Sequence, residues 1–162
     1  MKIYHLKRTQ FLPITLSEAW EFFSTPKNLA KITPEHMGFQ ILYISGAEKA
    51  YTGQIIQYKV SIIPGIKVNW VTEITHVKEP QYFIDEQRFG PYSLWHHQHH
   101  FKEVMGGIEM TDEVNFAIPL GWLGQLAHWI FVGREVNRIF DHRSEVLEKY
   151  FSNNRKGFLK AV

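Results

Sequence analysis

The chain has 162 residues, of which 44% are hydrophobic and 21% are charged. This length and balance predict one globular domain that buries about 70% of its unfolded surface, and they exclude a disordered chain. The absence of cysteine excludes disulfide scaffolds, thiolate metal sites and cysteine nucleophiles. The net charge is +2 and no basic run is longer than the pair Arg155-Lys156, so we expect no nucleic-acid partner.

The N-terminal residues MKIYHLKRTQF lack the apolar core and cleavage site of a signal peptide, so we expect a cytoplasmic protein. A later stretch, Val114 to Gly133, contains no Asp, Glu, Lys or Arg and has the length of a membrane span. Pro119 and Gly121 divide this stretch into a strand end, a turn and a helix start. We therefore expect no stable membrane insertion.

The first elements are a strand over residues 2–12 and then helical segments. Thr15-x-x-Glu18 is a capping box, in which each side chain accepts a hydrogen bond from the backbone amide of the other residue. Apolar residues then follow with helical spacing at Leu16, Ala19, Trp20 and Phe23. Thr25-Pro26 ends this helix, and a second short helix is expected over about 27–32.

From residue 38 to residue 117 the hydrophobic period changes to two, which is typical of strands. We expect strands over 39–45, 53–62, 66–77, 80–88, 93–104 and 108–117. The breaks between them are short and contain glycine or proline, as at Pro64-Gly65 and Gly106-Gly107. Such breaks predict hairpin connections and an antiparallel sheet.

The last part of the chain returns to helical spacing, with a helix expected over about 122–151. Its apolar stripe comprises Leu123, Leu126, Ala127 and Ile130, and continues through Val132, Val136, Ile139 and Phe140. The charged side chains between them, including Glu135 and Arg143, are expected on a solvated face. Residues 152–162 form a polar tail in this prediction, which leaves a single domain over 1–151.

A sheet with one apolar face has to be covered, and the last helix is the predicted element long enough to cover it. We therefore predict an α+β helix-grip fold. In this fold a curved antiparallel sheet of about seven strands wraps around a long C-terminal helix, with two short helices after strand 1. Leu123, Ala127 and Ile130 are expected to face inward. A gap between sheet and helix would form a cavity.

Four motifs support a more specific comparison. They are Arg88-Phe89-Gly90-Pro91-Tyr92, Trp95-x-His97-x-His99-x-Phe101, Phe116-x-x-Pro119-x-Gly121 and Ile139-Phe140-Asp141-x-Arg143. Together they resemble bacterial single-domain proteins of the START-like superfamily, also called SRPBCC or polyketide cyclase/dehydrase-like. The resemblance covers nearly the whole chain and implies the helix-grip fold. That superfamily includes lipid carriers, cyclases, hormone receptors and oxygenase domains, so the resemblance implies no single function.

The segment from Trp95 to Phe101 carries the most chemistry. Strand side chains alternate, so His97 and His99 share a face with these two aromatic residues and are expected inside. The opposite set, His96, Gln98 and His100, is expected in solvent. On strand 108–117, Asp112 has the same parity as the apolar residues Met110, Val114 and Phe116. A buried carboxylate needs a partner, and we expect Asp112 to hydrogen-bond His97 or His99.

Three interpretations of this group stay open. It is a structural network that satisfies buried polar groups, the polar end of a ligand cavity, or a metal site with two histidines and one carboxylate. The resemblance implies no metal here, so we expect neither a metal ion nor a cofactor. On strand 80–88, we place Phe83, Asp85 and Gln87 on the cavity side.

We predict that the protein binds a small hydrophobic molecule, which is lipid-, isoprenoid- or polyketide-like, between the sheet and the last helix. The expected binding residues are Trp70, Trp95, His97, His99, Phe101, Met110, Asp112, Phe116, Leu126 and Ile130. An alternative is a cyclase or dehydratase that moves protons with His97, His99 and Asp112, because imidazole titrates near neutral pH. Another is a membrane- or protein-interaction module that exposes the apolar segment 119–132. No pattern specifies an oligomeric state.

Overall fold

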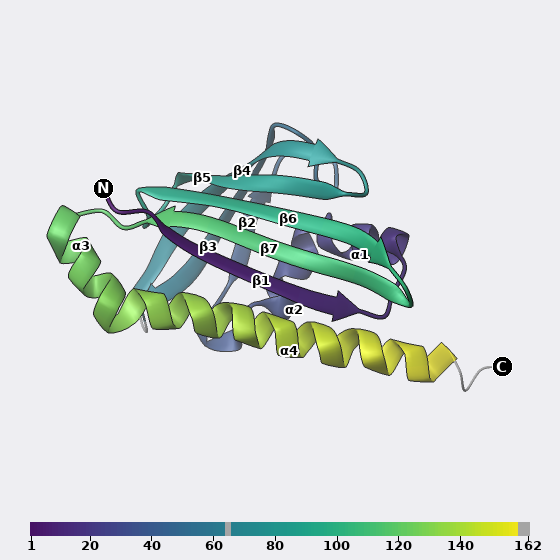
Figure 1. Cartoon of the computed structure of the whole chain (residues 1–162). Helices are drawn as coiled ribbons and strands as arrows, with labels where there is room; N and C mark the ends of the chain where they lie inside the picture. Colours follow the sequence, from purple (N-terminus) through teal and green to yellow (C-terminus); the bar gives the residue numbers. More distant parts are fainter. Residues whose placement is uncertain (64–65, 159–162) are drawn as a thin grey trace.

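The computed structural model describes residues 1–63 and 66–158 (Figure 1). Within these residues, seven strands form one antiparallel sheet in the order β1-β7-β6-β5-β4-β3-β2. The strands are β1 (Tyr4–Leu12), β2 (Gln40–Ile44), β3 (Gln54–Ile63), β4 (Ile66–Lys78), β5 (Tyr82–Phe89), β6 (Leu94–Val104) and β7 (Gly107–Ala117). Consecutive strands from β2 to β7 pair with one another, and β1 pairs with β7. The predicted antiparallel sheet is confirmed.

The segment between β1 and β2 contains the α-helices α1 (Leu16–Phe23) and α2 (Leu29–Ile32), with 3₁₀ turns at Pro26–Asn28 and Glu35–Met37. Helix α1 begins at the predicted capping box. The backbone amide of Glu18 donates to Thr15 Oγ1 at 3.2 Å, and the amide of Thr15 donates to Glu18 Oε2 at 2.7 Å. These bonds satisfy two amides that the first turn of a helix leaves free.

The C-terminal helical segment consists of α3 (Gly121–Ala127), a π-helical turn η3 (His128–Val132) and α4 (Gly133–Phe158). Figure 1 shows α4 lying along the sheet, while α3 lies beyond the strand ends. The helix continues to Phe158, so its predicted end at residue 151 is wrong. Residues 159–162 of the predicted tail lie outside the described residues. Among the described residues, no helix is both long enough and apolar enough to cross a bilayer.

Two apolar clusters join the sheet to the helices. One contains Trp20 of α1, whose ring contacts Phe83 and Phe101 edge-on, and it extends to Leu147 and Phe151 of α4. The other contains Trp70, Tyr92, Val114, Phe116, Val136 and Phe140. Full burial of one such side chain contributes about 1.5–3 kcal/mol. Because the two clusters use different parts of α4, they hold that helix against the sheet along its length.

The first half of the predicted apolar stripe does not face inward, which corrects the sequence-based expectation. Leu123, Leu126 and Ile130 are 49%, 46% and 52% exposed, and Ala127 is exposed as well. Helix α3 lies beyond the strand ends (Figure 1), and within Gly121–Ala127 only Gly124 is buried, so this half of the segment does not pack on the sheet. The inward positions belong to α4, at Val136, Phe140, Leu147 and Phe151.

Candidate functional site

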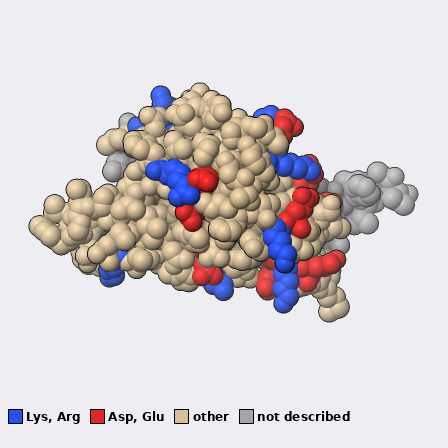
Figure 2. Space-filling model, turned by 90° about the horizontal axis from the view of Figure 1, so that it is seen from above, with Lys and Arg blue, Asp and Glu red and all other residues tan. Residues whose placement is uncertain are grey.

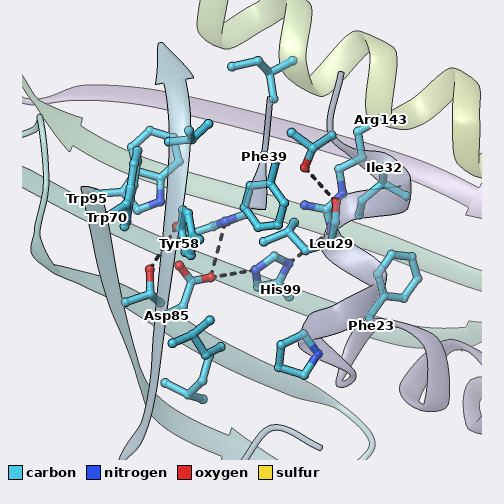
Figure 3. Close-up of a pocket in the computed structure, with 18 of the residues that line it drawn as sticks. Phe23, Leu29, Ile32, Phe39, Tyr58, Trp70, Asp85, Trp95, His99 and Arg143 are labelled. Atoms are coloured by element: carbon cyan, nitrogen blue, oxygen red, sulfur yellow. Dashed lines mark hydrogen bonds and ion pairs between the residues drawn. The ribbon is translucent and has the colours of Figure 1, made fainter. Parts of the chain in front are cut away.

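A cavity of about 190 Å³ lies between the sheet, the segment containing α1 and α2, and α4 (Figure 3). Most of its wall is apolar or aromatic, including Phe23, Leu29, Ile56, Trp70, Val136 and Phe140. Polar side chains gather at one part of this wall, where Tyr58, Asp85 and His99 lie close together in Figure 3. The cavity therefore combines an apolar interior with one polar region.

The structure divides the expected binding residues into three groups. Trp70, Trp95, His97 and His99 line the cavity. Phe101, Met110, Asp112 and Phe116 are buried, at 2–4% exposure, but among the described residues they are not part of the cavity wall. Leu126 and Ile130 are exposed on the α3–η3 segment and do not line it either. For these last two the expected inward orientation is wrong, because the α3–η3 segment is largely exposed and does not pack on the sheet.

The histidines of β6 lie between two carboxylates on the neighbouring strands. In the register, Asp85 of β5 is opposite His97, and Asp112 of β7 is opposite His99. His97 Nε2 is 3.0 Å and His99 Nδ1 is 2.9 Å from Asp112 Oδ1. On the other side, His97 Nδ1 is 3.5 Å and His99 Nε2 is 2.9 Å from Asp85 Oδ2. Each imidazole thus bridges both carboxylates, and the predicted pairing of Asp112 with the histidines is confirmed.

Arg143 of α4 completes this group, which we call the polar cluster: Asp85, His97, His99, Asp112 and Arg143. One guanidinium nitrogen of Arg143 lies 3.4 Å from Asp112 Oδ1 and forms an ion pair with it. The side chain is 8% exposed, so its expected position on the solvated face is wrong. Glu135, expected on the same face, is buried too. The missed signal for Arg143 was its position, since it follows Phe140 by three residues and precedes Leu147 by four.

The charges of the polar cluster balance. Burial would raise the pKa of Asp112, but the Arg143 guanidinium and the hydrogen bonds from both histidines hold that pKa well below its usual range. The two histidines also keep the pKa of Asp85 low against burial. Burial and the adjacent His99 lower the pKa of His97, whereas hydrogen bonds to both carboxylates outweigh burial and raise the pKa of His99. With His99 protonated and His97 neutral, the two carboxylates, the imidazolium and the guanidinium sum to zero charge.

Side chains on the opposite face of β6 and β5 form a separate, more exposed group. His96 Nδ1 is 3.0 Å from Glu86 Oε1, and both side chains are 30% exposed. His100 Nε2 is 3.1 Å from Gln98 Oε1. The predicted alternation along the histidine strand is confirmed, and His96 and His100 provide matched controls for His97 and His99.

The α3–η3 segment presents an apolar surface. Its exposed large apolar side chains are Trp122 at 71%, Leu123 at 49%, Leu126 at 46%, Trp129 at 77% and Ile130 at 52%, and Leu120, just before α3, is 76% exposed. On the face seen in Figure 2, the end of the molecule that carries α3 shows no Lys, Arg, Asp or Glu. Exposed tryptophans this close together are unusual on a surface that contacts only water.

Comparison with known proteins places the fold. Compared by sequence, the chain matches no family model and no curated protein. By structure, it is similar to protein Ms6760 from Mycobacterium smegmatis, with a TM-score of 0.67, 15% identity and coverage of 95% of this chain and 98% of that one. It is also similar to ginseng major latex-like protein 151 from Panax ginseng, with a TM-score of 0.64, 12% identity and coverage of 92% and 97%.

A third similar structure is the di-domain ARO/CYC StfQ from the steffimycin biosynthetic pathway, with a TM-score of 0.69 and 11% identity. The match covers 96% of this chain and 52% of StfQ. The chain has the START-like helix-grip fold. At these identities the START-like comparison shows the fold alone, so the chemistry has to be argued from the cavity and the polar cluster.

Proposed function

We propose that this protein binds a small, mostly apolar molecule in the cavity between the sheet and α4. The observation that carries the proposal is the cavity itself, whose wall is largely apolar while Tyr58, Asp85, His97 and His99 form one polar region. Ligand sites commonly combine an apolar wall with a few polar groups that orient the ligand. The ligand of this proposal has an apolar body and one oxygen-containing group that faces the polar cluster.

The cavity volume narrows the ligand class. Drug-sized ligands occupy cavities of about 300–1,000 Å³, and an engineered cavity of about 150 Å³ binds benzene. At about 190 Å³, this cavity accommodates a ligand close to a single ring in size. We therefore favour a monocyclic phenol, ketone or isoprenoid fragment over a full lipid, which would require the cavity to widen.

A cytoplasmic location of the protein stays a prediction.

Calorimetric titration with a panel of single-ring phenols and ketones tests this function. Ile139 lines the cavity, so Ile139→Trp fills it and is expected to abolish binding. The matched control is Arg138→Trp, the same replacement on the solvent side of α4, where the Arg138 side chain is 75% exposed. Wild-type and control proteins are expected to bind alike. Equal binding by Ile139→Trp, or no binding by the wild type, would contradict the proposal.

A second candidate is a cyclase or dehydratase, and the observation that favours it is the position of His97 and Asp85 on the cavity wall. A neutral imidazole beside a carboxylate can accept and return a proton of a bound carbonyl compound. Asp112 lies behind the histidines and would position them. Turnover of a cyclisable poly-β-keto thioester that is lost in His97→Gln, with ligand affinity retained, would support this candidate.

A third candidate is attachment to a membrane surface, and the exposed Trp122 and Trp129 favour it. Tryptophan is enriched at membrane–water interfaces, and apolar side chains on a helix can enter the headgroup region without spanning the bilayer. Co-sedimentation with anionic vesicles that is lost in Trp122→Ser/Trp129→Ser would support this function. Co-sedimentation that is absent in the wild type would exclude it.

A further inference from the structure

Three potential metal ligands converge at the polar region of the cavity. His97 Nδ1 lies 3.5 Å and His99 Nε2 lies 2.9 Å from Asp85 Oδ2. These side chains each offer one ligand atom, and the three atoms lie within 4.8 Å of one another. All three side chains line the cavity, and both histidines are buried. The group therefore differs from an exposed acidic patch, where carboxylates meet only water.

Asp112 sets the orientation of both imidazoles from behind. Its Oδ1 lies 3.0 Å from His97 Nε2 and 2.9 Å from His99 Nδ1. An ionised carboxylate only accepts hydrogen bonds, so His97 Nε2 carries the hydrogen that it donates to Asp112, and the lone pair of neutral His97 is on Nδ1, which faces Asp85. His99 Nε2 donates to Asp85 Oδ2 at 2.9 Å. A metal ion at His99 Nε2 would displace this hydrogen, and His99 Nδ1 would then donate to Asp112 Oδ1, 2.9 Å away. A carboxylate that holds the outer nitrogen of a metal-binding histidine is the usual second layer of such sites.

We propose that Asp85, His97 and His99 bind one divalent transition-metal ion. Two imidazole nitrogens and one carboxylate oxygen suit iron, zinc or cobalt better than magnesium or calcium. Ligand atoms that each lie about 2.0–2.2 Å from a metal ion are roughly 3.0–3.5 Å apart. The distances of 2.9 Å and 3.5 Å from Asp85 Oδ2 to the two imidazole nitrogens are close to this range. The carboxylate of this set is Asp85, whereas the sequence pattern had suggested Asp112.

The surroundings favour a cation at this position. The Arg143 guanidinium, 3.4 Å from Asp112 Oδ1, balances the charge of Asp112. His99 must be neutral to bind a metal ion, and the charge of Asp85 is then left for that ion. Because three protein ligands leave coordination positions open, and the ligands line the cavity, those positions face the cavity. An oxygen of a molecule in the cavity can complete the coordination. The metal site does not depend on the proposed organic ligand, since it uses the protein side chains alone.

Calorimetric titration of chelator-stripped protein with Zn²⁺ and with Co²⁺ tests the inference. We expect one ion per chain, and visible absorption bands from bound Co²⁺. Asp85→Asn and His97→Gln each remove a ligand and are expected to weaken binding by more than about 100-fold. Asp112→Asn removes the second layer and is expected to weaken it by about 10–100-fold. The matched controls, His96→Gln and His100→Gln, change histidines on the other face of β6 and are expected to bind like the wild type.

Circular dichroism and urea unfolding check that each variant is folded. Zinc binding by folded Asp85→Asn that equals the wild type would overturn the proposal, and so would an equal loss of affinity in His96→Gln. If Asp85→Asn and His97→Gln fail to fold, the Co²⁺ spectrum of the wild-type protein tests the metal site instead. Intense bands at one equivalent support the site, and the spectrum of hydrated Co²⁺ overturns it.

Discussion

Among single residues, Asp112 is expected to contribute strongly to the stability of the polar cluster. It is 4% exposed and contacts both histidines and Arg143. Its replacement leaves buried positive charge without a partner, and removing one member of a buried ion pair costs about 3–5 kcal/mol. Replacing Asp112 should therefore lower the free energy of unfolding more than replacing any surface carboxylate does.

A double-mutant cycle measures this coupling. In urea unfolding, Asp112→Asn is expected to lower the free energy of unfolding by about 3–5 kcal/mol, and His97→Leu also lowers it. The double variant is expected to lose less than the sum, by about 0.5–3 kcal/mol, because contacting residues are not additive. The control pair, Glu86→Gln with His96→Leu, is partly exposed and is expected to couple by less than about 1 kcal/mol. Strict additivity at Asp112 would contradict the buried contact.

Titration of His99 makes stability depend on pH. The folded protein raises the pKa of His99 above 6.5, because its hydrogen bonds to Asp112 and Asp85 outweigh burial. The folded state thus binds the proton more tightly than the unfolded state. This contribution is fully present below pH 6.5 and is lost as the pH rises through the folded-state pKa of His99. The neighbouring His97 has a lowered pKa, so its effect on stability lies below pH 6.5.

With a chelator present, urea unfolding of the wild type above pH 6.5 is therefore expected to show a falling free energy of unfolding. His99→Gln does not titrate and is expected to remove this slope. A wild-type stability that rises over this range, or an unchanged slope in His99→Gln, would show that the assigned proton is elsewhere.

Among the elements, the two halves of the C-terminal helical segment contribute differently to stability. Phe140 of α4 is 4% exposed and contacts the His97 ring, with ring centroids 5.5 Å apart, whereas Leu126 of α3 is 46% exposed. Phe140→Ala is expected to lower the free energy of unfolding by about 3–5 kcal/mol. Leu126→Ala is expected to change it by less than about 0.5 kcal/mol, as surface substitutions usually do. Urea unfolding compares the two, and similar losses would mean that α3 packs on the protein.

For the whole molecule, the difference in packing between α3 and α4 predicts which backbone amides exchange slowly. The strands β5, β6 and β7 pair on both edges and carry the four polar-cluster residues other than Arg143, so their amides are expected to exchange slowly. Amides of α3 are expected to exchange faster than those of α4 near Val136 and Phe140, because most α3 side chains are exposed and make few packing contacts. Mass spectrometry of peptic fragments measures both. Equal protection of α3 and α4 would contradict this description.

Local patterns along the chain were sufficient to predict the strands, the capping box at Thr15 and the inward faces of β6 and β7. Alternation and capping depend on residues close in sequence, so a single chain carries that information. The burial of His97, His99 and Asp112 follows from this alternation and was predicted correctly.

Long-range packing decided the rest. The contact of Asp85 with both histidines depends on the register between β5 and β6, which local alternation does not specify. Arg143 is buried because Asp112, on a strand far away in sequence, balances its charge, although by itself an arginine is expected in solvent. Leu126 and Ile130 have the apolar character of a buried stripe, yet the position of α3 beyond the strand ends leaves both side chains exposed.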